Sequence, residues 1–508
     1  MLNRQMIFMD IEKIIQIAKR RGFIFPSSEI YGGLSGFFDY GPVGLSMKRK
    51  LQNLWREFFV NPENNIFEME SSLIMHEKVW EASGHLKDFI DPLTQCKKCN
   101  SFYRADNLIE ETAGKFVEGL RPEDLTKLIK ENNIKCPKCK GELSDVKIFN
   151  LMFSSNIGPV AGNVAYLRPE TAQGIFVNFK NLLASTRASL PFGVAQMGNS
   201  YRNEISPRQW IMRLREFRQM EIEYFFNPKK VDVPDEKILK TKVRLLTREE
   251  QEKKNPKELE ITAEEAVKKS ILPNKIMAYF IAKELLWYQG LGIPKDALRF
   301  RHMKPEETPH YSKGNFDMEI KFDFGWKEVV GNAYRADHDL STHMKHSGEN
   351  FEVVDGEEKV LPHVVEPSFG VERTVYAILL HCYREGKERG WEWFEFPPKI
   401  APFAAGVFPL VGKDGLPEKA KEIHSELKKC FDVFYDESGS IGKRYARTDE
   451  IGVPAAITID HQTLEDKTVT IRNRNSMKQI RVKIEDLKDV LWKILEGEKF
   501  EKLGKLVK

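Results

Sequence analysis

Residues 201–226, YRNEISPRQWIMRLREFRQMEIEYFF, carry five arginines and four glutamates among large apolar side chains. The second half of this segment predicts a β-strand, in which alternate side chains point to opposite faces of a sheet. One face would then carry Phe217, Gln219, Glu221 and Glu223, and the other Arg218, Met220, Ile222 and Tyr224. So much charge on a strand with an apolar reverse face points either to a binding site or to a salt-bridged, solvated hairpin.

The spacing within this strand favours a two-part ligand. Phe217 and Glu221 are four residues apart, about 13 Å at the usual rise of a strand. A planar base on the ring and an ammonium group at the carboxylate would be spanned by a molecule the size of an aminoacyl-adenylate. Arg202 and Glu204 are expected to share a face of the preceding strand. The loop between the strands, which carries Arg208 and Arg213, could reach phosphates.

A second candidate is HVVEPSFGVER, residues 363–373. Alternation places Glu366, Ser368 and Gly370 on one face of a strand whose other face is apolar. A helix is expected to begin near Glu372, so Arg373 would lie in its first turn, where the helix dipole disfavours cations. A bound phosphate would resolve this conflict, although the side chain could also simply extend into solvent.

A third segment, LRPETAQGIF, spans residues 167–176. Arg168 and Glu170 are expected to end a strand, and Thr171 to cap the helix that follows. On these residues alone, ordinary capping explains the pattern as well as a functional site does.

Four of the six cysteines form two pairs, Cys96-Lys-Lys-Cys99 and Cys136-Pro-Lys-Cys139. Four thiolates at this spacing suit tetrahedral zinc, with free thiols as the alternative. Because four cysteines would fill the coordination sphere, the predicted zinc is structural. Walker A and Rossmann fingerprints do not occur where a strand meets a helix.

The rest of the 508-residue chain indicates an α/β protein of several domains. The paired prolines at 397–398 mark a boundary, because they cannot continue a helix or a central strand. Residues 227–273 are strongly charged and predict an insertion that projects from the core. The net charge of +4 neither requires nor excludes a nucleic-acid partner. No membrane-length apolar run or secretion signal is found, so we expect a cytoplasmic protein. The predicted domains are 1–95 with 147–397, an insertion at 96–146, the insertion at 227–273, and 398–508.

Together these segments resemble the class II aminoacyl-tRNA synthetases, and among them the glycyl-tRNA synthetases of the homodimeric type. YRNE (201–204) and RLREF (213–217) are similar to the second class II motif, and FGVER (369–373) to the third. Residues 41–60 and 66–75 resemble the first motif, a dimer-forming helix and strand. LRPETAQGIF, EPSFG (366–370), SGH (83–85) and RADNLIEE (104–111) are typical of the glycine enzymes. The resemblance covers essentially the whole chain.

The resemblance implies an antiparallel-sheet catalytic core with helices (α+β), a zinc-knuckle insertion, and a C-terminal α/β anticodon-binding domain. It implies ATP, Mg²⁺ and structural Zn²⁺ as cofactors, glycine and tRNA(Gly) as partners, and a glycyl-adenylate intermediate. Arg202 and Arg373 would be catalytic. The implied ATP-binding residues are Arg202, Asn203, Glu204, Met212, Arg213, Leu214, Arg215, Glu216, Phe217, Glu328, Val329, Gly370 and Arg373. The implied glycine-binding residues are Arg104, Glu170, Phe217, Glu221, Glu366, Ser368 and Gly370. The implied metal ligands are Cys96, Cys99, Cys136 and Cys139.

Alternative functions are a synthetase for threonine, serine or proline, and a non-catalytic binding protein on the same scaffold. The three glutamates and Ser368 favour a small anionic pocket and hence glycine, and the presence of Arg202, Arg213 and Arg373 favours catalysis. The first motif departs from the family at His76, where a proline is common. Arg472, Arg474, Lys478 and Arg481 alternate along a C-terminal hairpin. They could contact tRNA phosphates or form a solvated edge, and the resemblance favours tRNA.

Overall fold

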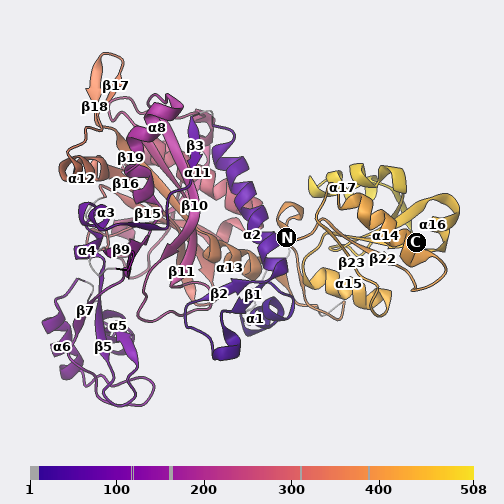
Figure 1. Cartoon of the computed structure of the whole chain (residues 1–508), viewed down its shortest axis with the longest axis horizontal. Coiled ribbons are helices and arrows are strands. Elements are labelled where there is room, and N and C mark those ends of the chain that lie inside the picture. Colours follow the sequence, from indigo (N-terminus) through magenta and orange to yellow (C-terminus); the bar gives the residue numbers. More distant parts are fainter. Residues whose placement is uncertain are drawn as a thin grey trace.

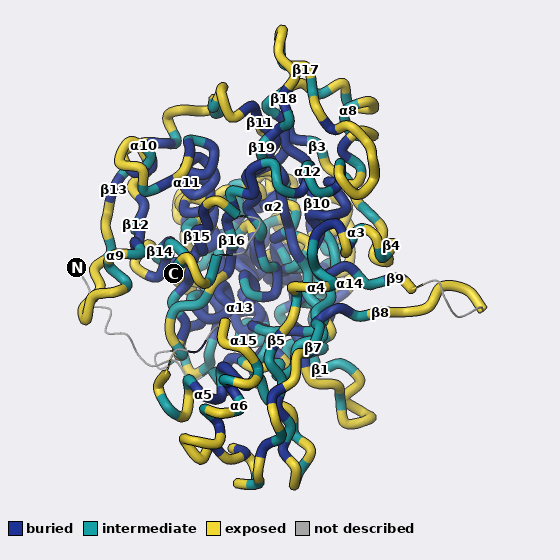
Figure 2. The backbone as a smooth tube through the Cα atoms, turned by 90° about the vertical axis from the view of Figure 1, so that its left-hand side faces the viewer, coloured by how far each residue is buried: buried dark blue, intermediate teal, exposed yellow. Residues whose placement is uncertain are grey.

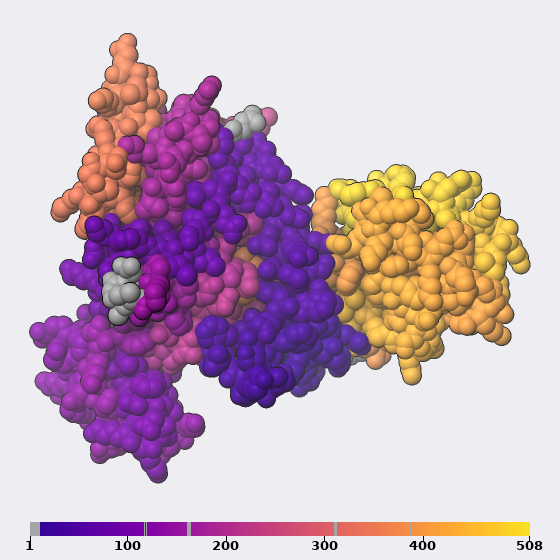
Figure 3. Space-filling view, in the orientation of Figure 1, coloured from indigo at the N-terminus to yellow at the C-terminus, as the bar shows by residue number. Residues whose placement is uncertain are grey.

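The computed structural model describes residues 11–63, 65–115, 117, 119–159, 164–308, 312–386 and 389–507. Figure 1 shows a large central body, a small lobe at one corner and a C-terminal domain on the opposite side. The small lobe contains β5 (Ile90–Gln95), α5 (Ala105–Ala113), α6 (Pro122–Glu131) and β7 (Lys147–Asn150). The space-filling view shows the C-terminal domain as a separate lobe (Figure 3). Within the described ranges, no helix has both the length and the apolar character needed to cross a bilayer.

The central body is built on one nine-stranded, largely antiparallel sheet. β11 (Glu216–Phe226) and β19 (His363–Gly370) lie inside this sheet, and one face of each strand is apolar and buried. In spatial order the strands are β13 (Leu259–Thr262), β12 (Lys242–Leu246), β14 (Leu298–His302), β15 (Asn315–Phe322), β16 (Gly325–Ala336), β19 (His363–Gly370), β11 (Glu216–Phe226), β10 (Phe192–Tyr201) and β3 (Ile66–Met69). The predicted antiparallel core is therefore present.

Helices cover the apolar face of this sheet. The side chains of Met220, Ile222 and Tyr224 in β11 are buried there in one large cluster. The same cluster includes residues of α1 (Ile11–Arg20), α2 (Pro42–Trp55), α11 (Lys275–Gly290) and α13 (Val371–Cys382). In Figure 2 the central strands are buried along most of their length, whereas the small lobe and the β17–β18 hairpin (Val353–Asp355, Glu358–Val360) carry much exposed chain.

The opposite face of the sheet is only partly covered. Phe225 packs there with residues of α7 (Ala172–Phe176) and α12 (His338–Ser347). The odd-numbered side chains of β11 from Phe217 to Glu223 share this face with Phe225, as the alternation predicts. A small sheet of β4 (Ile74–His76), β9 (Val164–Leu167) and β8 (Phe153–Asn156) lies beside it, with α3 (Glu77–Ala82) and α4 (His85–Asp88). Phe179 of α8 (Phe179–Thr186) packs against Phe225. His76 ends β4, and its Nδ1 accepts a hydrogen bond from the Lys78 amide at 3.1 Å.

The segment 227–273 does not project from the core, and that expectation is wrong. Its strands β12 and β13 extend the sheet at one edge, and α10 (Ala263–Lys268) follows them. Val243, Leu245 and Ile261 are buried in the main core. The high charge of the segment misled the prediction because an edge hairpin buries only alternate side chains.

The C-terminal domain contains a six-stranded sheet and four helices. The order is β23 (Val433–Tyr435), β22 (Ala405–Pro409), β24 (Ala455–Ile459), β25 (Thr468–Asn473), β26 (Gln479–Lys483) and β27 (Lys505–Val507). The helices are α14 (Leu416–Leu427), α15 (Ile441–Glu450), α16 (His461–Asp466) and α17 (Leu487–Leu495). This domain has its own hydrophobic core, as the alternating strands and helices predict.

Candidate active site

A cavity of about 250 Å³ opens on the partly covered face of the sheet. Its walls come from β11, β15, β16, β19, the start of α13, the loop after β10 and the segment before α7. Of the residues that the sequence nominates, the cavity brings together Glu170, Arg202, Glu204, Met212, Arg213, Leu214, Phe217, Glu221, Glu328, Val329, Glu366, Ser368, Gly370 and Arg373.

Four nominated residues lie outside this lining: Arg104, Asn203, Arg215 and Glu216. Arg104 is paired with Asp91 at 3.1 Å and with Asp106 at 2.8 Å in the neighbouring lobe. Arg215 Nε donates to the Glu204 carbonyl at 2.9 Å, and Glu216 accepts from Asn199 Nδ2 at 2.9 Å. Arg215 therefore braces the loop that carries Glu204, rather than facing the cavity.

The loop after β10 delivers the basic groups at one end of the cavity. β10 ends at Tyr201, so Arg202 and Glu204 follow the strand and do not share one of its faces as expected. The Arg202 guanidinium lies 5.2 Å from the centre of the Phe217 ring, and its Nε donates to the Pro169 carbonyl at 3.1 Å. Arg208 pairs with Glu111 on the surface, where both side chains are exposed, and does not line the cavity.

Opposite charges at this end hold one another in place. Arg213 Nη1 lies 3.7 Å from Glu204 Oε2, and Arg373 Nη1 lies 3.0 Å from Glu328 Oε2. Burial opposes ionisation of Glu328, but Arg373, Arg202 and Arg213 outweigh it and lower the pKa of that carboxyl. Burial and the nearby Glu328 raise the pKa of Asp317 well above its usual range. Three arginines beside paired carboxylates suit a polyphosphate with a divalent cation.

At the other end of the cavity lie three nominated glutamates, and two of them pair with a buried arginine. Arg335 Nη1 lies 2.6 Å from Glu366 Oε2, and Arg335 Nη2 lies 3.8 Å from Glu170 Oε1. The same guanidinium makes two 2.7 Å hydrogen bonds with Asp339 in the first turn of α12. The side chains of Arg335 and Asp339 are each 2% exposed. The arginine therefore fixes two pocket carboxylates from behind.

Polar neighbours orient the remaining carboxylates. Gln173 Nε2 donates to Glu170 Oε1 at 3.0 Å, and His85 Nε2 lies 3.4 Å from Glu170 Oε2. The Thr171 hydroxyl donates to Glu221. Thr171 stands at the N-cap position of α7, but its side chain does not cap the helix. The expectation of ordinary capping is therefore wrong, because the Thr171 hydroxyl is hydrogen-bonded to the buried carboxylate of Glu221 instead.

The pKa values of the pocket carboxyls differ widely, because that of Glu170 is lowered while those of Glu221 and Glu366 are raised. Burial opposes ionisation of Glu170, yet His85, Arg335 and Gln173 hold its pKa well below the usual range. Burial and Glu170 raise the pKa of Glu221. Burial raises the pKa of Glu366 to about 8 despite the contact with Arg335. An empty pocket of this kind is electrostatically strained, and an ammonium group would relieve the strain.

A rigid wall limits the size of this end. Ser368 faces Glu221 in the register between β19 and β11. Gln219 Nε2 donates to Ser368 Oγ at 3.0 Å, and Ser200 Oγ donates to Gln219 Oε1 at 2.6 Å. The cavity at this end therefore suits a very small ammonium-bearing molecule.

Sequence reasoning missed Arg335, Asp339, Gln173 and Gln219 as parts of this site. Gln219 was visible on the charged face of β11 but was given no role. Arg335 and Asp339 carried only a weak signal, an i,i+4 charged pair at a strand-to-helix junction, which usually indicates a solvated surface.

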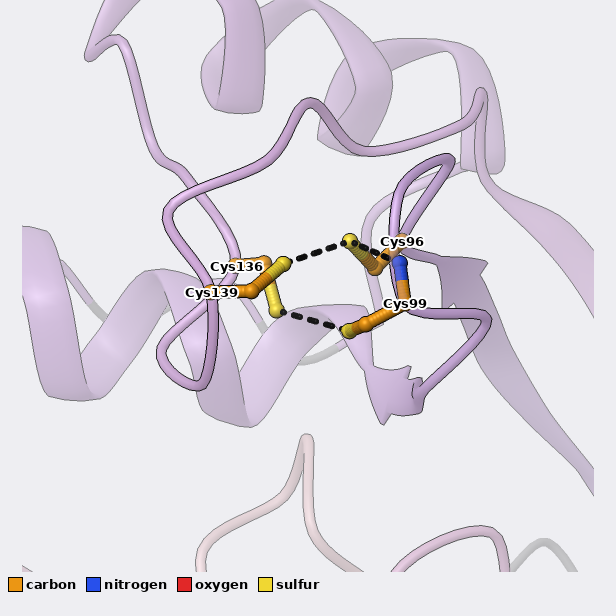
Figure 4. A group of neighbouring side chains, drawn as sticks. All are labelled: Cys96, Cys99, Cys136 and Cys139. Carbon is orange, nitrogen blue, oxygen red and sulfur yellow. Dashed lines mark hydrogen bonds between the residues drawn. The ribbon is translucent and has the colours of Figure 1, made fainter.

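The small lobe brings the four predicted metal-ligating cysteines together (Figure 4). Cys96 Sγ lies 3.5 Å from Cys139 Sγ, Cys99 Sγ lies 3.6 Å from Cys136 Sγ, and all four atoms lie within 4.8 Å of one another. Tetrahedral Zn–S bonds of about 2.3 Å would place the sulfurs about 3.8 Å apart. The lobe consists of β5 (Ile90–Gln95), β6 (Phe102–Arg104), β7 (Lys147–Asn150), α5 (Ala105–Ala113) and α6 (Pro122–Glu131). The donor set and its spacing fit zinc.

The C-terminal hairpin forms, but two of its basic residues face inward. Arg472 makes hydrogen bonds of 2.9 and 3.0 Å with the buried Asp449. Arg474 donates to the carbonyls of Gly452 and Phe396, the latter at 2.6 Å. Their side chains are buried, so contact of these two with tRNA phosphates is not supported. Lys478 and Arg481 are paired with Glu501 and Asp460.

Comparison with known proteins agrees with this arrangement. Residues 161–382 match the family "tRNA synthetase class II core domain (G, H, P, S and T)", and residues 404–494 match "Anticodon binding domain". The chain is similar to the glycine–tRNA ligase of Pyrococcus furiosus, with 43% identity over 97% of this chain and 100% of the relative. It is 40% identical to that of Methanothermobacter thermautotrophicus over 96% of this chain and 100% of the relative. With the class II core and the small anionic pocket already described, this similarity shows that the chain belongs to the glycine–tRNA ligase family of class II aminoacyl-tRNA synthetases.

Proposed function

We propose that the cavity on β11 is the site at which this glycine–tRNA ligase activates glycine with ATP and transfers it to tRNA(Gly). The observation that carries the proposal is the division of one strand face. Phe217 lies at the end that is rich in arginines, and Glu221 lies at the end that is rich in carboxylates, on the same strand. A glycyl-adenylate has its base and its ammonium group at opposite ends, which suits this division.

At the nucleotide end, the base would stack on Phe217, and Arg202 would hold the α-phosphate. The glycine carboxylate would attack the α-phosphorus in line, forming the mixed anhydride as pyrophosphate leaves. Arg213 and Arg373 would neutralise charge on the leaving pyrophosphate. Class II synthetases use ATP with Mg²⁺, and Glu328 and Asp317 carry carboxylates suited to hold that cation, which would offset further phosphate charge.

At the glycine end, Glu170, Glu221 and Glu366 would accept hydrogen bonds from the substrate ammonium. Glycine has no side chain to bind, and an apolar pocket alone rejects one extra methyl group by only about 1–3 kcal/mol. Ser368, held by Gln219, would exclude larger side chains by steric contact. The tRNA terminal ribose hydroxyl would then attack the glycyl carbonyl and release AMP.

Structural zinc and a homodimer also belong to the proposal. Zinc on Cys96, Cys99, Cys136 and Cys139 would hold the small lobe together. β3 is an edge strand of the main sheet, and a surface hollow lies between it and α2, lined in part by Arg49, Arg56 and Glu68. This edge matches the first class II motif and is the proposed dimer surface. The expected cytoplasmic location remains a prediction.

ATP–pyrophosphate exchange with each amino acid singly tests the assignment. We expect exchange with glycine and a loss of about 100-fold or more in Arg202→Ala. Lys180→Ala, on the exposed surface, is the matched control and should retain activity. Exchange with serine, threonine or proline would contradict the pocket assignment, and equal exchange in Arg202→Ala would contradict the role of the arginine.

A further inference from the structure

Glu223 is a buried carboxyl group that the mechanism above does not use. It follows Glu221 on the same face of β11, but its side chain is fully buried and does not line the cavity. Neither of its carboxylate oxygens has a hydrogen-bond partner among the described residues. Carboxylate oxygens of Glu221, Glu223 and Glu366 lie within 4.8 Å of one another. Glu223 is thus directly behind two of the groups proposed to bind the glycine ammonium.

The neighbouring carboxylates each have a donor, whereas Glu223 has none in the described part of the chain. Glu366 is bound by Arg335 at 2.6 Å. Glu221 accepts from the Thr171 hydroxyl and, at 3.4 Å, from Gln219. An ionised carboxylate left without a donor in a dry interior carries a large free-energy penalty, which a bound proton removes.

The surrounding charges are also unbalanced. The charged and titratable groups that face this cluster are Glu221 on β11, Glu366 on β19, Arg335 on β16, Asp339 and His343 on α12, Glu170 before α7, Arg168 after β9, and His85 on α4. Arg335 forms an ion pair with Glu366 of the cluster, and it is already shared with Asp339 and Glu170. Arg168 acts on Glu221, but its guanidinium donates hydrogen bonds to Asn199 and Ser71. Burial lowers the pKa of His343, so its imidazole does not add a cation. Ionising Glu223 in the empty pocket would therefore place another negative charge beside several existing ones.

We propose that Glu223 is a positioning residue that holds a proton in the empty pocket and releases it when the glycine ammonium binds between Glu221 and Glu366. The O–H bond of the Glu223 carboxyl breaks, the proton passes to solvent and is taken up by buffer base, and the carboxylate becomes a counter-charge to the ammonium. The proposal deepens the assignment of the glycine pocket and rests on it. Burial and Glu366 raise the pKa of Glu223 well above its usual range, in agreement with a protonated resting state.

The proposal predicts how affinity depends on pH. Below the pKa of Glu223 in the empty pocket, binding must remove a proton, so affinity rises with pH. Release of one proton corresponds to about a tenfold fall in the dissociation constant for glycine per pH unit. A neutral amide at position 223 would keep the side-chain shape but remove the transferable proton. It should make this dependence less steep and weaken binding near pH 8.

Calorimetric titration of glycine into the full-length protein at pH 7, in phosphate and in Tris, measures the proton count directly. These buffers differ in ionisation enthalpy, so released protons make the observed heat buffer-dependent. Glu366, whose pKa burial raises to about 8, can also release a proton at this pH. We therefore expect at least about one proton released per glycine in the wild type, and about one proton fewer in Glu223→Gln. Glu284→Gln is the matched control. Glu284 is another fully buried glutamate with a raised pKa, and it accepts a hydrogen bond from Asn332. It lies outside the glycine pocket, so Glu284→Gln should release as many protons on glycine binding as the wild type.

The outcomes separate this inference from the assignment of the pocket. Glycine binding without proton release in the wild type overturns the role of Glu223 while leaving the pocket intact, and this holds even where Glu223→Gln does not fold. Wild-type release in a folded Glu223→Gln also overturns it. Absence of any glycine binding would instead contradict the proposed function.

Discussion

Arg335 and Glu366 form a buried ion pair in which Nη1 lies 2.6 Å from Oε2. The arginine is the penultimate residue of the long strand β16, and the glutamate lies on the adjacent β19. The contact therefore joins two neighbouring strands at the glycine end of the cavity. Removing one partner of such a pair leaves an uncompensated charge in the interior. The pair is therefore a direct target for mutation.

We predict that Arg335→Met lowers the free energy of unfolding by about 3–5 kcal/mol and raises the KM for glycine. The methionine leaves Asp339, Glu366 and Glu170 without their shared cation. Urea denaturation and ATP–pyrophosphate exchange measure the two effects. Lys180→Met removes one partner of an exposed pair with Glu349 and should change stability by no more than about 1 kcal/mol. A similarly small effect in Arg335→Met would refute the role given to the arginine.

Ser368→Gly should reduce the preference for glycine over alanine by about tenfold to a hundredfold. The substitution removes the side chain that Gln219 holds at 3.0 Å and opens space beside Glu221. Exchange rates with glycine and alanine as functions of concentration give the ratio of kcat/KM. If alanine remains as poor a substrate as in the wild type, the steric wall lies elsewhere.

Zinc should copurify at about one equivalent per chain and be lost in Cys136→Ser, because three thiolates cannot complete the predicted tetrahedral set. Cys430, which is exposed and far in sequence from both cysteine pairs, provides the control Cys430→Ser, with unchanged zinc. Atomic absorption gives the metal content, and thermal denaturation should show a lower Tm after chelation. Wild-type zinc content in Cys136→Ser would exclude this site.

The fully buried Glu284 predicts a pH dependence of stability that is separate from catalysis. Burial raises its pKa to about 8, against a hydrogen bond from Asn332 Nδ2 at 3.0 Å. A raised carboxyl pKa favours the folded state fully below the unfolded pKa of about 4.5, and this contribution is lost as pH rises toward 8. Between pH 4.5 and pH 8 the contribution of Glu284 to the free energy of unfolding falls by about 4 kcal/mol.

Glu284→Gln should remove this dependence, so its stability relative to the wild type should increase between pH 5 and pH 8. Urea denaturation of both proteins across that range measures the difference. Parallel stability curves for the two proteins would show that Glu284 does not titrate in the folded state in this range.

The main elements of the site could be predicted from local patterns. The alternation in β11 identified Phe217, Glu221 and their shared face, because strand geometry makes every second side chain a neighbour. The strand-to-helix junction at Arg373 was equally clear. Arg335 and Asp339 were not found, because what makes them important is burial by other strands and helices distant in sequence.

The C-terminal hairpin shows the converse error. Alternating Arg472 and Arg474 suggested an exposed basic surface, but Asp449 and two backbone carbonyls draw both side chains inward. A charged residue in a sequence does not reveal whether the folded chain places a buried ion-pair or hydrogen-bond partner beside it. In the segment 227–273 charge likewise concealed the buried residues of an edge hairpin.

The register of β11 carries a consequence for how this enzyme can change. The strand is hydrogen-bonded on both sides, with Phe217 opposite Ser200 on β10, and Glu221 opposite both Gln196 on β10 and Ser368 on β19. Insertion or deletion of one residue between Phe217 and Glu221 would turn one end of the site toward the apolar core. The distance between the two proposed subsites is thus fixed by backbone pairing. Substitution of pocket side chains can therefore change which amino acid the enzyme prefers. A change in the length of β11 would instead separate the two subsites from their shared face.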